Sequence, residues 1–299
     1  MRAHWVGAML VVYLMEPMFC GTAHAADWML DASAQANYNN NPAFAIEADQ
    51  IEGEVSLATD VAAGQSYQLT DRLALSLTAN LAGEYHAQFS GLDNVGAGAS
   101  AALGGKLGLG LDAPWWRVSG GAMFRDYDFS PRDGMRYFAS AAIGRRWGER
   151  LSTQIGYQFD ATRSSDVVDI PRAVTVFGLY GDAFNLTGNA IAVQASYDIS
   201  PRWTFQTGYA RRYGTVCSST RIDRDVLLAS SAVARDPVFG VDRVAYRVNA
   251  PSNFFNVLLN YALADQVAME VTWEHRDATT GDYIAYSNNV TRLVLHYSY

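Results

Sequence analysis

Apolar and polar residues alternate along most of the chain with a period of two, in one block after another. Between residues 151 and 162 the odd-numbered positions are mostly apolar, with Leu151, Ile155, Tyr157 and Phe159, and the even-numbered positions are polar or glycine. Successive side chains of a β-strand point to opposite faces, so this period predicts a strand with one apolar and one polar face. Comparable blocks begin at Leu73, Ile191, Trp203 and Val267.

The length of the blocks and the breaks between them favour one kind of β-protein. The blocks run for roughly ten to fifteen residues, whereas the strands of soluble sandwiches average about five or six. Longer irregular stretches, the largest at 214–243, alternate with short polar breaks at 70–72, 112–114, 148–150, 200–202 and 264–266. Short turns on one side and long loops on the other are typical of a transmembrane barrel.

The pattern therefore predicts an all-β fold, a transmembrane antiparallel up-and-down β-barrel of about twelve strands. The sheet has to close, because an open sheet in lipid would leave unpaired backbone groups at its edges. The first two strands and the stretch 170–185 are ambiguous, so ten and fourteen strands are the alternatives. The expected strands are at about 28–38, 53–69, 73–87, 95–111, 115–128, 134–147, 151–163, 188–199, 203–215, 244–263, 267–278 and 284–299.

The first residues of the chain have a different pattern. A basic start at Arg2 is followed by a largely apolar run at 5–15 and by Ala23-His24-Ala25, the small-x-small pattern that signal peptidase reads. The apolar run is too short to span a bilayer as a helix. We expect a cleaved secretory signal peptide at 1–25 and a single barrel domain at 26–299.

The composition agrees with a membrane protein. Of the 299 residues, 49% are hydrophobic and 17% charged, whereas soluble proteins are about 25% charged. The net charge of −8 argues against a nucleic-acid partner. After cleavage Cys217 would be the one remaining cysteine, which excludes an internal disulfide and a cysteine-based zinc site. Tryptophans beside the short breaks suit an interfacial girdle, namely Trp28, Trp115, Trp116, Trp147 and Trp203.

The last block, 291–299, carries Leu293, Leu295, Tyr297 and Tyr299 on one face. It resembles the C-terminal signal of Gram-negative outer-membrane barrels, although Phe or Trp is commoner than Tyr at the last position. The resemblance implies an outer-membrane location, contact with lipid and lipopolysaccharide, and recognition by the barrel-assembly machinery. The size resembles the twelve-stranded group, which includes nucleoside and oligosaccharide channels, a phospholipase and autotransporter translocators.

If the apolar face meets lipid, the polar face lines a lumen. Such a lumen, with basic residues on some strands and acidic residues on others, creates a transverse field that selects polar solutes. Alternatively, opposite charges pair and fill the interior, which would give a narrow or closed barrel. The expected lumen-lining residues are Glu84, Lys106, Arg117, Arg125, Arg136, Arg146, Asp160, Arg212, Glu270, Glu274 and Arg276.

An enzymatic reading needs a base or a nucleophile. His86 is the weak catalytic candidate, because the pattern places it on the polar face near the long-loop rim, where a surface hydrolase would work. The chain has no match to the local motif of the outer-membrane phospholipases. We expect no metal and no cofactor, and the sequence favours a role other than catalysis.

The sequence thus predicts a porin-like channel for small polar solutes or oligosaccharides. One alternative is a structural or surface-interaction barrel that serves an export or adhesion system, and another is a rim hydrolase. The sequence does not identify the solute, the partner or the oligomeric state, nor whether the lumen is open or plugged. The roles of the 214–243 loop and of Cys217 are also open, and the default expectation for the loop is a solvated segment.

Overall fold

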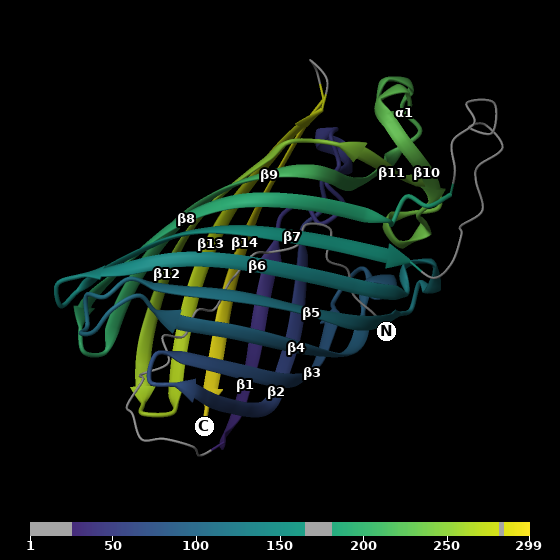
Figure 1. The fold of residues 1–299 in the computed structure, drawn as a ribbon. Helices are drawn as coiled ribbons and strands as arrows, with labels where there is room; N and C mark the ends of the chain where they lie inside the picture. Colours follow the sequence, from purple (N-terminus) through teal and green to yellow (C-terminus); the bar gives the residue numbers. More distant parts are fainter. Residues whose placement is uncertain (1–25, 165–180, 281–283) are drawn as a thin grey trace.

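The computed structural model describes residues 26–164, 181–280 and 284–299, and the expected signal peptide lies outside these residues. Twelve of the described strands close into one antiparallel barrel, because β14 pairs with both β13 and β1 and β9 pairs with both β8 and β12 (Figure 1). This confirms the predicted fold class. The barrel strands are β1 (Ala26–Asn39), β2 (Glu54–Thr70), β3 (Leu73–His86), β4 (Asn94–Lys106), β5 (Trp115–Tyr127), β6 (Gly134–Trp147), β7 (Leu151–Ser164), β8 (Leu186–Ser200), β9 (Trp203–Arg221), β12 (Ser252–Ala264), β13 (Val267–Thr280) and β14 (Ile284–Ser298).

The barrel wall is apolar outside and polar inside, the reverse of a soluble protein. On β3, Leu81 is 62% exposed. The alternate residues Thr78 and Asn80 hydrogen-bond to Ser100 of β4, with oxygen–oxygen and nitrogen–oxygen distances of 2.6 and 3.3 Å. Because apolar surface is costly in water, an outer wall of this kind is one that lipid covers.

The short connections lie together at the end of the barrel where β14 ends (Figure 1). Two-residue turns join β2 to β3 and β8 to β9, and Gly148 adopts a φ of 72° in the turn after β6. Glycine tolerates this left-handed conformation without steric cost. Trp28 and Trp147 are exposed on the outside near this end, where an interfacial girdle would lie.

Two expected strands differ from those observed. The strand expected at 95–111 ends at Lys106, and the following turn contains Gly110 with a φ of 91°. The block expected as one strand at 244–263 is two strands, β11 (Arg243–Asn249) and β12, separated at Pro251. Proline lacks the N–H that a strand interior donates, so the ladder breaks there. The barrel still has twelve strands, because β11 lies outside it.

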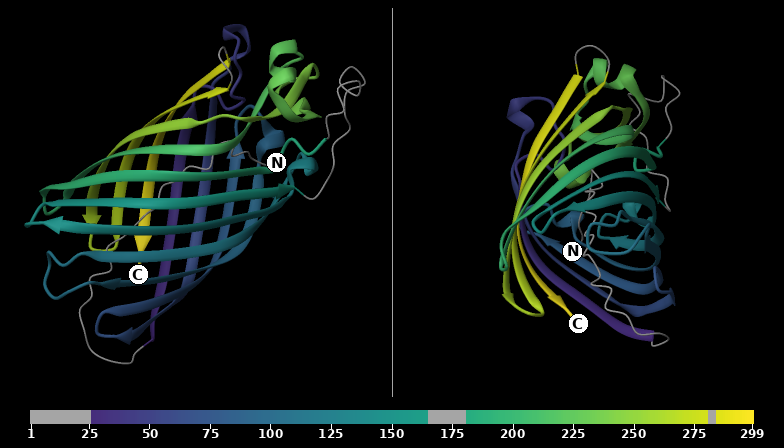
Figure 2. Two further views of the ribbon diagram at one scale, coloured as in Figure 1. Left: turned by 45° about the horizontal axis from the view of Figure 1, so that its top comes forward. Right: turned by 60° about the vertical axis from the view of Figure 1, so that its left-hand side comes forward.

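Residues 222–251, which we call the cap, fold into ordered structure, so the expectation of a solvated loop was wrong. The cap contains α1 (Arg224–Ala229), β10 (Ser230–Arg235), a 3-10 helix at Pro237–Phe239 and β11. β11 pairs with the last part of β9, beyond the barrel wall, and β10 pairs with β11. In all views these elements lie at the end of the barrel opposite to the short turns (Figure 2). Other 3-10 helices are at Ala48–Gln50, Ser90–Leu92 and Ser130–Arg132.

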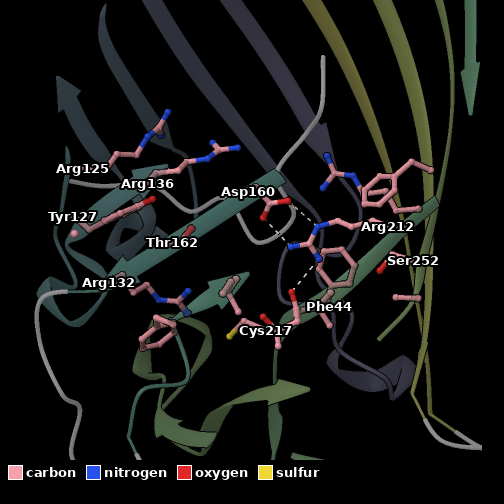
Figure 3. Close-up of a pocket in the computed structure, with 18 of the residues that line it drawn as sticks. Phe44, Arg125, Tyr127, Arg132, Arg136, Asp160, Thr162, Arg212, Cys217 and Ser252 are labelled. Atoms are coloured by element: carbon pink, nitrogen blue, oxygen red, sulfur yellow. Dashed lines mark hydrogen bonds and ion pairs between the residues drawn. The ribbon is translucent and has the colours of Figure 1, made fainter. Parts of the chain in front are cut away.

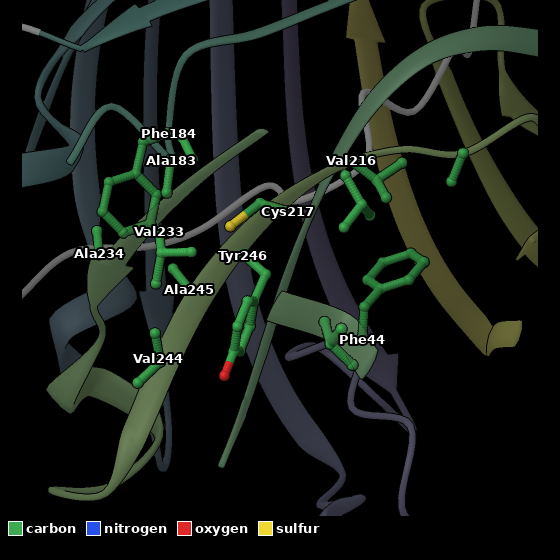
Figure 4. Close-up of a cluster of buried hydrophobic side chains, with 14 of the residues drawn as sticks. Phe44, Ala183, Phe184, Val216, Cys217, Val233, Ala234, Val244, Ala245 and Tyr246 are labelled. Carbon is green, nitrogen blue, oxygen red and sulfur yellow. The ribbon is translucent and has the colours of Figure 1, made fainter. Parts of the chain in front are cut away.

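The largest buried apolar cluster lies between the cap and the barrel (Figure 4). Val233 and Tyr246 of the cap are fully buried there, together with Phe44 from the β1–β2 connection and Phe184 from the segment before β8. A second cluster joins the cap to the β3–β4 connection, where the Phe89 and Phe239 rings lie 4.9 Å apart. The cap is therefore held by hydrophobic contacts to several loops. The helices among the described residues are too short and too polar to cross a membrane.

The reactivity of the Cys217 thiol shows whether the cap is packed against the barrel. It lies on the part of β9 that pairs with β11, is 1% exposed, and burial raises the pKa of its thiol to about 12. Since the thiolate is the reactive form, we expect the folded protein to resist thiol reagents at neutral pH and the denatured protein to react fully. The measurement is reaction with a chromogenic disulfide in a Cys20→Ser background, with the additional Cys217→Ser variant as a blank. Rapid labelling of the folded protein would contradict the burial of Cys217 beneath the cap.

Candidate functional site

A cavity of about 60 Å³ lies where the inner barrel wall meets the cap side of the molecule (Figure 3). Barrel strands contribute Arg125, Arg136, Asp160 and Arg212, and the opposite boundary includes Phe44. Figure 3 shows Arg125 and Arg136 on one side and Arg212 on the other, with Asp160 between them. The cavity is therefore lined by charged side chains toward the lumen, and toward the cap by apolar side chains together with Arg132.

Arg212 and Asp160 form a bidentate salt bridge in the wall of the cavity. Arg212 Nε and Nη2 donate to the two carboxylate oxygens of Asp160 at 3.0 and 2.8 Å, and Nη1 donates to the Thr215 carbonyl at 3.0 Å. The pair joins β9 to β7 across Gly188 of β8, where a Cβ atom would lie only 2.1 Å from Arg212 Nη2. Glycine at this position leaves the space that the bidentate pair requires.

A second charged group lies on β13 and β14. Arg276 donates to Glu274, and the Arg292 guanidinium lies 4.0 Å from the same carboxylate. Nearer the short-turn end of the same two strands, Glu270 accepts a hydrogen bond from Thr272 at 2.7 Å and lies 3.8 Å from His296. These acidic side chains are buried, and basic or hydroxyl groups neighbour each of them.

The wall formed by β4, β5 and β6 differs. Lys106, Arg117, Arg125 and Arg136 lie on it, half-buried, and no carboxylate of the described residues is within 4.0 Å of their charged nitrogens. Arg125 donates one hydrogen bond to Asn94 at 3.1 Å. Among the described residues, the β4–β6 wall thus carries basic side chains without a carboxylate within 4.0 Å, whereas the charged side chains of β7, β9, β13 and β14 described above have charged or hydroxyl partners.

The acidic side of β2 and β3 includes His86, the catalytic candidate. His86 is buried, and its Nε2 lies 3.5 Å from Glu84, which accepts a hydrogen bond from Ser56 at 2.6 Å. Glu54 lies 4.0 Å from the other ring nitrogen and accepts the backbone N–H groups of residues 87 and 88. The structure therefore places His86 in a buried cluster, not at an accessible rim as the sequence pattern suggested.

The remaining candidates lie at the short-turn end or on the outer wall. Arg146 pairs with Asp198 at 2.9 Å, and both are partly exposed near the turns. The candidate assembly signal is exposed on the outer face of β14 and at the chain end, namely Leu293, Leu295, Tyr297 and Tyr299. The described residues contain no group of three or more His, Cys, Asp or Glu side chains that could hold a metal ion.

Sequence reasoning missed the residues that hold the cap over the site. Arg132, from the β5–β6 connection, makes a buried salt bridge with Asp236 of the cap, 104 residues later, and lies 3.9 Å from the centre of the Phe184 ring. Ser219 also donates to Asp236. Connections between strands have no period of two, so no local signal marks these residues as buried partners.

No protein-family model matches the chain, and no curated protein matches it. Among solved structures, an outer-membrane channel from Pseudomonas putida F1 has a TM-score of 0.58 and 13% identity, over 93% of this chain and 97% of that one. The chain has the fold of an outer-membrane channel. The match to the NanC porin extends over 89% of this chain and 98% of the porin chain, with a TM-score of 0.47 and 12% identity.

Proposed function

We propose that the protein is a porin-like channel of the bacterial outer membrane, through which small polar solutes, including oligosaccharides, diffuse. The observation that carries this proposal is the row of charged and polar side chains inside a closed barrel whose outer wall is apolar. The outer-membrane channel that shares the fold supports it. Export through a cleaved signal peptide, assembly by the barrel-assembly machinery and contact with lipopolysaccharide belong to the same proposal.

The proposed pathway runs along the unpaired basic wall. A solute that leaves water needs polar partners inside the barrel, and the charged side chains supply them. Positive charge that lacks a carboxylate partner favours anions over cations along this wall. The side chains proposed to line the pathway are Glu84, Lys106, Arg117, Arg125, Arg136, Arg146, Asp160, Arg212, Glu270, Glu274 and Arg276.

We expect the refolded protein to give stepwise currents in planar bilayers. Under a salt gradient, the sign of the reversal potential should show that anions pass more readily than cations. Replacement of both Lys106 and Arg117 by glutamate should move the reversal potential toward cation preference, because the field along the basic wall changes sign. Arg145→Glu is the matched control, since Arg145 is exposed on the outer face of β6. An unchanged reversal potential in the double variant would contradict the proposed lining.

A second candidate function is a surface-interaction barrel, and the folded cap favours it. Leu228 and Val241 of the cap are strongly exposed, as is expected for a surface that binds a partner. The two functions differ in conductance. A barrel that carries no current at any voltage, even when the cap has been released, would serve interaction and not passage.

A further inference from the structure

We propose that the cavity beneath the cap is a binding site for a short-chain organic carboxylate, held by Arg125 and Arg136. The inference rests on the proposed function in one respect, because it names a class of solute for the channel. The site itself is defined by the charge, the hydrogen-bond donors and the apolar surface of the cavity, and binding there does not depend on conduction.

The charges that line the cavity do not balance. Three of its arginines have a carboxylate partner: Arg212 with Asp160, Arg132 with Asp236, and Arg276 with Glu274. The other carboxylate in the lining, Asp277, accepts two hydrogen bonds of 2.9 Å from Asn253. Arg125 and Arg136 remain without a carboxylate partner among the described residues.

These two arginines lie on adjacent strands and near one another. Arg125 of β5 is opposite Gly134 in register, and Arg136 of β6 is opposite Met123, so the two positions are offset by one pleat on the same face. Arg125 Nε is buried without a hydrogen-bond partner in the described structure. A guanidinium group has five donor hydrogens. Two such groups side by side repel each other, and an anion between them removes the repulsion and accepts the free donors.

The space and the opposite boundary restrict the anion. A cavity of about 60 Å³ holds on the order of four or five water-sized groups, too few for an oligosaccharide unit. Phe44, Phe184 and Val216 give the cap side an apolar surface, beside Arg132, whose charge is paired with Asp236. An inorganic anion would leave that surface in contact with water, whereas a short carbon chain covers it. A carboxylate group on a chain of a few carbon atoms satisfies both sides.

The probe is propionate, measured by saturation-transfer NMR on the full-length protein refolded in detergent at low salt, and the other ligands are measured by how far they displace propionate. Propanamide has nearly the same shape without the charge, and inorganic phosphate has charge without the carbon chain. We expect propionate to bind at least tenfold more tightly than propanamide and more tightly than phosphate. Equal affinity for propanamide would overturn the role of the arginines, and equal or tighter binding of phosphate would overturn the role of the apolar surface.

Variants test the two named side chains. The Arg125→Gln, Arg136→Gln double variant should lose at least tenfold in propionate affinity, whereas Arg145→Gln, on the outer face of β6, should bind as the parent does. A compact band on unboiled gels shows that each variant is folded, and the comparison of ligands on the parent protein needs no variant. Propionate binding unchanged by the double substitution would overturn the proposal. A barrel that conducts without binding propionate refutes this site alone, and one that binds without conducting refutes the passage alone.

Discussion

Asp236→Ala is expected to release the cap and raise the single-channel conductance of the barrel several-fold. Asp236 is fully buried and accepts hydrogen bonds from Arg132 and Ser219. Its removal leaves the Arg132 charge buried without its carboxylate, and breaking one partner of a buried salt bridge costs about 3–5 kcal/mol. The contacts that hold the cap over the cavity are local, so this loss falls on the cap and not on the barrel ladder.

Two measurements on the same variant separate release of the cap from its effect on passage. The Cys217 thiol should become reactive at neutral pH, because the cap covers it. The planar-bilayer conductance should rise in the same sample. Asp242→Asn is the matched control: Asp242 also pairs with an arginine of this region, Arg221, but both are exposed, and solvent screens such a pair so that its loss changes stability little. A reactive thiol with unchanged conductance would show that the cap does not obstruct the lumen.

Deletion of residues 291–299 is expected to abolish the folded barrel. β14 lies between β13 and β1 and pairs with both along most of its length. Without it, the edges of both neighbours expose backbone N–H and C=O groups to lipid, where each unsatisfied group costs several kcal/mol. On unboiled gels the parent should run as a compact band and the truncated chain as an unfolded one. A compact band from the truncated chain would mean that the barrel closes without β14.

The terminal aromatic side chain tests assembly separately from closure. Tyr299 exchanges two backbone hydrogen bonds with Leu30, at 2.9 and 3.1 Å, and its side chain is exposed. Tyr299→Ala keeps those backbone bonds, so it should refold in detergent like the parent. In cells it should reach the outer membrane in smaller amounts if the assembly machinery reads the aromatic group. Tyr213→Ala, which removes an exposed aromatic from β9, is the control, and equal reductions in both would contradict a terminal signal.

The sequence predicted which residues of each strand face lipid, because the alternation of apolar and polar residues within a strand marks its two faces. The block from Leu151 to Thr162 became β7, with Ile155 and Tyr157 exposed outside and Gln158 and Asp160 buried inside. The period of two is a local property of the extended backbone, so it needs no knowledge of the partner strands. Closure then followed from the requirement that no edge remain open in lipid. The number of strands came from counting the blocks, with ten and fourteen as the alternatives, and the structure decided on twelve.

The sequence predicted the candidate site only in part. Parity placed Arg125, Arg136, Asp160 and Arg212 on the polar face, and these side chains line one cavity. It did not reveal that Arg212 pairs with Asp160, while the other two arginines have no carboxylate partner in the part of the chain that the structure describes. Pairing depends on which strands are neighbours and on the register between them, and the space left by Gly188 decides whether Arg212 reaches across β8.

The sequence by itself determined the alternating faces, the closed antiparallel barrel, the side of the short turns and the polar character of the interior. Only the tertiary structure decided that residues 222–251 fold into a cap, that Pro251 separates β11 from β12, that His86 is buried, and that Arg132 meets Asp236. The physical reason is the range of the interactions. A strand pattern repeats every two residues along the chain, whereas the cap is held by contacts between loops far apart in sequence, whose residues follow no period.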